Sequence, residues 1–103
     1  MGLIKNNYQF KGYNLHTAYA RVKVNTERNK AVFYIGASRD MAFNDPIDKV
    51  EIYIPFTNTK DPRIEAYEYV KGQYEEMEWN EKTNKYEKVV KYRPFFDWTD
   101  IDI

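Results

Sequence analysis

"VNTERNKA" (residues 24–31) and "WNEKTNKY" (residues 79–86) are two copies of one pattern. Each copy has an apolar residue, Asn, three polar residues, Asn-Lys, and then an apolar or aromatic residue. The first copy is flanked by two stretches with a period of two. In "AYARVKV" small or branched apolar residues alternate with Tyr, Arg and Lys, and in "AVFYIGA" Ala31, Phe33, Ile35 and Ala37 alternate with Val32, Tyr34 and Gly36. The second lies between "YEEMEW" and "YEKVVKY". Alternation on both sides of a polar stretch is typical of a β-hairpin, so the sequence predicts two hairpins.

The asparagines of the repeated pattern suit the two ends of a hairpin turn. The Asn25 side chain can bond the backbone two residues further along, and Asn29 tolerates the left-handed conformation that closes a longer loop. The second copy repeats this arrangement. We therefore interpret the repeat as turn chemistry and not as a binding motif.

The region between the hairpins predicts one strand and one helix. "KVEIYIPF" (residues 49–56) alternates strongly, and Pro55 marks the end of the strand or an edge position. In "TKDPRIEAYEYVKG", Asp61 suits the N-cap, Pro62 the first helical position and Gly72 the stop. Residues 38–48 predict a loop with a turn at 44–46. The expected fold is mainly β: one domain over residues 1–103, an antiparallel β-sandwich or curled sheet with one short α-helix around residues 61–71.

Composition excludes several classes of protein. There is no cysteine, so disulfides and thiolate chemistry are excluded. Sixteen basic residues balance sixteen acidic ones, so no overall field attracts nucleic acid or an anionic membrane. The first fifty residues carry eight basic and four acidic residues, which could align two copies head to tail. No apolar run is long enough for a membrane span, and the first ten residues lack a signal-peptide core. We expect a protein made in a cytoplasm and not inserted into a membrane.

Catalytic and cofactor sites have weak support. The only histidine, His16, and the only serine, Ser38, lie in separate segments without a local motif. No spacing of metal ligands and no glycine-rich phosphate loop is present. Paired carboxylates for glycoside hydrolysis could occur among the acidic residues of the second hairpin, but any acidic strand offers such pairs. These residues are Glu75, Glu76, Glu78 and Glu81. We expect a non-enzymatic protein without a cofactor or metal.

Aromatic residues provide the first candidate interface. Ten tyrosines are present, and three of them lie opposite the more apolar face of their predicted strands, near an arginine. The candidate residues are Tyr19, Arg21, Tyr34 and Tyr53. Three interpretations remain open: the second face of a sandwich packed inward, a protein interface rich in tyrosine and arginine, and a platform that stacks single-stranded nucleic acid. Zero net charge and the nearby Glu51 argue against nucleic acid.

The C-terminal stretch "YRPFFDWTDIDI" provides a second candidate. Phe95, Phe96 and Trp98 lie among aspartates, so the segment is either a last strand at a sheet edge or an exposed acidic-aromatic tail that docks onto a partner or another copy. Both alternatives remain open.

Residues 13–72 resemble a known family. "NLHTAYARVKV", "RNKAVFYIGASRDMA", "DPIDKVEIYIPF" and "DPRIEAYEYVKG" follow in the order seen in small proteins of the tail and baseplate region of tailed bacteriophages of Gram-positive bacteria. The order is similar to that in the shoulder domain of lactococcal phage receptor-binding proteins. The resemblance implies a β-sandwich with one helix and a role in the viral tail, and it implies no saccharide site. The second hairpin and the C-terminal stretch lie outside it.

Three functions follow as expectations. The first is a tail or baseplate protein that contacts other phage tail proteins or itself, located in the virion. The alternative is a host-takeover protein in the host cytoplasm that inhibits a host enzyme, with the acidic second hairpin as a charge mimic. The third is a small carbohydrate-binding module that stacks sugars on Trp79 or Trp98.

Overall fold

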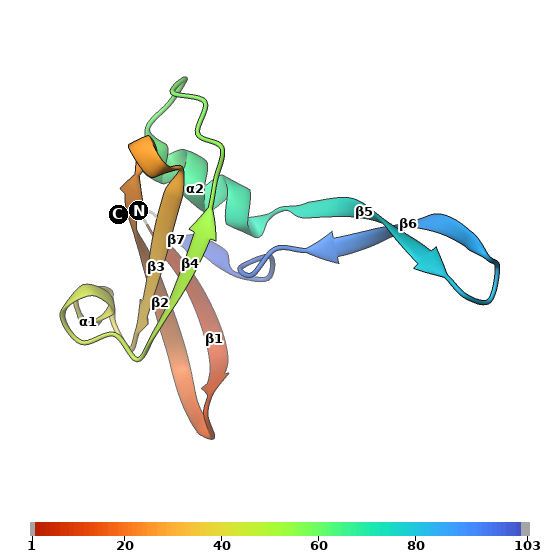
Figure 1. Ribbon diagram of the computed structural model, residues 1–103. Coiled ribbons are helices and arrows are strands. Elements are labelled where there is room, and N and C mark those ends of the chain that lie inside the picture. Colours follow the sequence, from red (N-terminus) through yellow and green to blue (C-terminus); the bar gives the residue numbers. More distant parts are fainter. Residues whose placement is uncertain (1, 102–103) are drawn as a thin grey trace.

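The chain forms two antiparallel sheets and one helix of ten residues, as a computed structural model that describes residues 2–101 shows (Figure 1). The larger sheet has the strand order β4-β3-β2-β1-β7, and the smaller one is the hairpin β5-β6. The strands of the larger sheet are β1 (Gly2–Phe10), β2 (Tyr13–Asn25), β3 (Lys30–Gly36), β4 (Asp48–Tyr53) and β7 (Thr99–Ile101). Between them lie the 3-10 helix Thr26–Arg28, α1 (Arg39–Asn44), α2 (Pro62–Lys71), β5 (Gln73–Asn80) and β6 (Lys85–Tyr92). The expected class, mainly β with antiparallel sheets and one short helix at residues 61–71, is confirmed.

Both predicted hairpin turns are present with the expected asparagine chemistry. Asn25 accepts a hydrogen bond from the backbone N–H of Arg28, three residues along, and Asn80 accepts one from that of Lys82, two residues along. Asn29 and Asn84 both have a left-handed backbone, with φ of 51° and 54°. The repeated pattern therefore builds the same kind of turn twice.

One core lies between the larger sheet and α2. Small and β-branched side chains on one face of β2 and β3 allow the helix to approach closely. Phe33 lies at the centre, with its ring 5.8 Å from that of Tyr67 in α2 and 4.9 Å from that of Phe95. The smaller sheet instead projects away from this body (Figure 1). We call this hairpin, residues 73–92, the arm.

Helix α2 forms where its sequence predicts. Asp61 caps it by accepting from the N–H of Arg63 at 2.8 Å, and Pro62 occupies the first position. Glu65 is buried, and its carboxylate accepts from the backbone N–H and the hydroxyl of Thr57 at 2.7 and 3.0 Å. This pair ties the loop after β4 to the helix, which gives the buried acid a structural role.

Two segments differ from expectation. Residues 38–48 were expected to form a loop, but Arg39–Asn44 form the helix α1, because the Ser38 hydroxyl accepts from the N–H of Met41 and caps the first turn. The C-terminal stretch forms strand β7 only at Thr99–Ile101, paired with β1. Residues 102–103 lie outside the described part of the chain.

Candidate interaction surface

The arm has one apolar face and one polar face. Register pairs Trp79 with Tyr86 near the tip and Gln73 with Tyr92 at the base, which places these residues on the same face. Phe96 extends this face beyond the base, because its ring lies 4.7 Å from that of Tyr92. We call this surface the apolar arm face. Its large apolar side chains are Met77, Trp79, Tyr86, Val90, Tyr92 and Phe96.

The apolar arm face is open to solvent. Trp79 is 52% exposed, Tyr86 66% and Tyr92 58%. Of the ten large hydrophobic residues that are exposed in the described part of the chain, six lie here. Beyond its base, the arm extends away from the larger sheet and α2 (Figure 1). Scattered exposed apolar residues are ordinary, but a contiguous patch on one face is typical of an interaction site.

The opposite face of the arm carries charged side chains. Lys91 lies beside Glu76, with 3.4 Å between Nζ and the carboxylate, and forms a closer ion pair with Glu78. These two carboxylates raise the pKa of Lys91, the hydrogen bond to Glu78 most of all. Because the charges are exposed, they keep this face in water and contribute little to stability. The arm is therefore amphipathic, and the large apolar side chains of its other face are exposed.

The base of the arm is fixed to the body. The guanidinium of Arg93 lies over the ring of Tyr69 in α2 at 3.8 Å and over that of Tyr74 in β5 at 4.6 Å. The backbone N–H of Arg93 also donates to the carbonyl of Gly72 at 3.0 Å. These contacts hold both strands of the arm against the end of α2, which sets the direction in which the arm projects.

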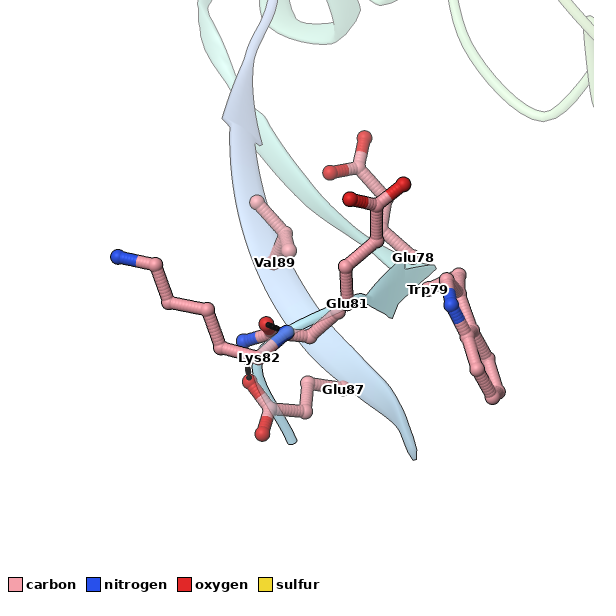
Figure 2. A pocket seen from close by; sticks show the side chains of 7 residues that line it. Glu78, Trp79, Glu81, Lys82, Glu87 and Val89 are labelled. Atoms are coloured by element: carbon pink, nitrogen blue, oxygen red, sulfur yellow. Dashed lines mark hydrogen bonds between the residues drawn. The ribbon is translucent and has the colours of Figure 1, made fainter. Parts of the chain in front are cut away.

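The tip of the arm carries a hollow on the polar side (Figure 2). Asn80 donates to Glu87 at 2.9 Å, and Thr83 also donates to Glu87, which lowers the pKa of that carboxyl. In Figure 2 the carboxylates of Glu78 and Glu81 point to the opposite side from that of Glu87. The hollow is lined by Glu78, Trp79, Asn80, Glu81, Lys82, Glu87 and Val89. The Asn80 amide and the Thr83 hydroxyl, which both donate to Glu87, belong to the turn.

The predicted interface residues of the larger sheet share its outer face. Arg21 lies directly opposite Tyr34 in the β2–β3 register, and Tyr19 comes two residues before Arg21 in β2. Helix α1 covers part of this face, because the Phe43 ring lies 4.0 Å from the Arg21 guanidinium and 5.8 Å from the Tyr34 ring. Tyr53 lies apart on the edge strand β4, opposite Lys30, and is 71% exposed. The structure thus brings three of the four together, and two of those three pack on Phe43.

The predicted residues of the C-terminal stretch are divided between core and surface. Phe95 and Trp98 are 1% and 6% exposed, so both belong to the core and neither offers a contact surface. Trp98 packs on Phe95 at 5.0 Å between ring centroids and on Tyr8 at 5.6 Å. Phe96 alone points outward, where it joins the apolar arm face.

Sequence reasoning named Trp79 only as a platform for sugars, and it missed the other members of the apolar arm face, which are Met77, Tyr86, Val90 and Tyr92. Met77 and Trp79 are in phase in β5, and Tyr86, Val90 and Tyr92 are in phase in β6, so the alternation already placed each set on one face. The alternation does not say whether that face lies in an interior or on the surface. The projection of the arm from the body makes it a surface.

The single histidine and the single serine have the following places in the structure. His16 is an exposed residue of β2, and the Ser38 hydroxyl caps α1. Among the described residues there is no group of three or more side chains that could hold a metal ion. No described helix has the length and apolar character needed to cross a membrane. Comparison of the chain with protein-family models, curated proteins and solved structures gives no match.

Proposed function

We propose that this chain is a non-enzymatic structural or assembly protein of a tailed phage, from the tail or baseplate region, that acts through protein contacts made by the apolar arm face. The single observation that carries the docking role is the set of six large apolar side chains gathered on one exposed face of the arm.

The arm on its own has little to stabilise it. A two-stranded hairpin is marginal in water unless its apolar face packs on another layer. Burying one large apolar side chain contributes roughly 1.5–3 kcal/mol. A partner that covered Trp79, Tyr86 and Tyr92 would therefore stabilise both the arm and the complex. Aromatic side chains also dominate the energetic centres of protein interfaces.

The location in a phage tail rests on the resemblance of residues 13–72. The strand, turn, strand, strand and helix that the resemblance implies have counterparts in β2, β3, β4 and α2. The arm lies outside the resemblance, so it is the part that distinguishes this chain from a bare shoulder-like module. This order of elements supports the proposal without naming a partner.

The alternatives have less support. A charge mimic requires acidic groups on one surface, but Glu75 lies on the apolar arm face while Glu76 and Glu78 lie on the opposite face beside Lys91. A carbohydrate platform at Trp98 would require an exposed ring, and this ring is buried. Trp79 is exposed, but Tyr86 packs against it edge to face at 5.2 Å.

The proposal is tested by following the chain in purified particles. Antibody to the chain should detect it in virus particles after density-gradient purification as well as in the infected-cell lysate. A double variant of the arm, Trp79→Ser with Tyr86→Ser, should accumulate in the lysate but be lost from the particles. The matched control, Lys85→Ser on the polar face of the same arm, should remain in the particles. Absence of the wild-type chain from purified particles would refute the tail location.

A further inference from the structure

We infer that the occupant of the apolar arm face is the same face of a second copy of this chain, so that two arms pack face to face across a two-fold axis. This inference rests on the proposed docking role of the arm. It goes further, because it names the partner and the symmetry of the contact.

The described part of the body offers no matching surface. The other exposed large hydrophobic residues are single residues in α1, in the loop that follows it, in β4 and in α2. They are Met41, Ile47, Tyr53 and Ile64. If one copy contacts another through apolar surface, the only contiguous patch in the described part of the chain is the apolar arm face itself. Contact of a patch with itself requires two-fold symmetry.

The pattern of the apolar arm face is nearly the same from either end. An aromatic pair lies at the tip, Trp79 with Tyr86, and another lies at the base, Tyr92 with Phe96. Between them are two rows, each with one aliphatic side chain and one charge: Glu75 opposite Val90, and Met77 opposite Lys88. Reversal of the arm therefore places aromatic residues on aromatic residues.

The charges of the apolar arm face are complementary between one copy and a reversed second copy. The row with the acid and the row with the base exchange places when the arm is reversed, so Glu75 of one copy faces the row that carries Lys88 of the other. Within one arm, the Glu75 carboxylate and the Lys88 ammonium lie 3.9 Å apart and are largely exposed. Both groups are therefore accessible to a contact between copies. Packing of two sheet faces, about 10 Å apart, brings side chains of both into one layer.

The size of the face sets the expected strength. The face is one hairpin wide and eight residues long, so it belongs to the small class of interfaces, below about 1,200 Å² in total. We expect a dissociation constant on the order of micromolar. The dimer should therefore dissociate on dilution, as a component that assembles at high local concentration would.

The test uses two single variants that are complementary only between copies. Glu75→Lys leaves two cations on the apolar arm face, and Lys88→Glu leaves two anions. Each variant loses the Glu75–Lys88 ion pair within its own arm, so the arms of the two variants are weakened to the same extent. Each alone should dimerise at least about tenfold more weakly than the wild type, because like charges meet across the axis. An equimolar mixture should regain dimers in sedimentation velocity, because all charges across the axis are then opposite.

The matched control makes the same charge changes on the other face of the arm. Glu76→Lys and Lys91→Glu should each leave the wild-type dimer in place, and mixing them should add nothing. A wild-type chain that stays monomeric at the highest concentration it reaches would overturn the inference, and so would a mixture of the Glu75 and Lys88 variants that stays monomeric. The proposed function would survive that result if the Trp79/Tyr86 double variant were still lost from particles. Retention of that double variant in particles would refute the docking role itself.

Discussion

The hairpins β2–β3 and β5–β6 share a turn but differ in what covers them. Both are built around the Asn-x3-Asn-Lys pattern, with a left-handed asparagine at the close. The inner face of β2–β3 carries Ala20, Val22 and Phe33, which are at most 4% exposed beneath α2. In the arm, by contrast, Trp79, Tyr86 and Tyr92 are each more than half exposed to water. The turn therefore specifies a hairpin, while the side chains of the strands decide whether it becomes core or projects.

The largest expected difference lies between two aromatic residues, one in each hairpin. Phe33→Ala should lower the free energy of unfolding by about 3–5 kcal/mol, because the cavity would lie between Tyr67 and Phe95. Trp79→Ala should lower it by about 1 kcal/mol or less, because its main loss is one cross-strand pair. Urea denaturation measures both. Equal losses would show that the arm belongs to the cooperative core.

The close approach of α1 to β3 gives the next effect. A Cβ atom at Gly36 would lie 2.6 Å from the backbone nitrogen of Ala42, so Gly36→Ala should cost about 2–3 kcal/mol. Gly72→Ala, at the junction between α2 and the arm, is the matched control, because its Cβ would meet only the Tyr69 carbonyl at 3.6 Å. Urea denaturation measures the free energy of unfolding of both variants. A loss from Gly36→Ala that is no larger than the loss from Gly72→Ala would contradict this packing.

A smaller effect comes from a hydrogen bond that only the body hairpin receives. The backbone N–H of Val22 donates to the hydroxyl of Tyr67 at 3.0 Å. Tyr67→Phe leaves this buried N–H without its acceptor and should cost about 1–2 kcal/mol near neutral pH. Tyr53→Phe, at an exposed hydroxyl, should change the urea midpoint little.

The same tyrosine predicts a dependence on pH. Burial raises the pKa of Tyr67, so the unfolded chain loses this proton first, at about pH 10. The neutral phenol thus contributes stability fully below that pH, and the contribution is lost as the pH rises toward the folded pKa. Urea midpoints of the wild type and Tyr67→Phe should therefore converge above about pH 10. A gap that stayed constant or widened would contradict the assigned burial.

The smallest expected effect separates the two turns. Asn29→Ala and Asn84→Ala each place alanine in a left-handed conformation, which costs about 1 kcal/mol. In the body turn this loss should appear in global unfolding. In the arm it should appear only as faster amide exchange of residues 73–92, because the arm opens without the core. A global loss from Asn84→Ala would contradict this separation.

Much of the fold can be predicted from the sequence because its signals are local. The two turns, strand β4 and helix α2 follow from alternation, caps and turn residues that are read within a few positions. Strand β1 was not predicted, because "KNNYQF" shows no clean alternation and Asn7 has a φ of 57° within the strand. Helix α1 has six residues, which is too short for a periodic signal, and in the sequence only the N-cap residue Ser38 indicates it.

The site could be predicted only in part because exposure is a tertiary property. Phe95, Phe96 and Trp98 look alike in the sequence, but only Phe96 points away from the core. The alternation of β5 and β6 identifies one apolar face, although nothing local states whether a second layer covers it. That depends on Arg93, whose contacts with Tyr69 and Tyr74 fix the base of the arm and direct it away from the sheet.

The most direct test of the account is amide hydrogen exchange measured by mass spectrometry over a range of protein concentrations. We predict that residues 73–92 are protected at high concentration and exchange rapidly on dilution, because a second copy covers the apolar arm face only when dimers form. Amides of β2 and β3 should keep the same protection throughout. Arm protection that is independent of concentration would contradict the account, because the arm would then be stable without a second copy.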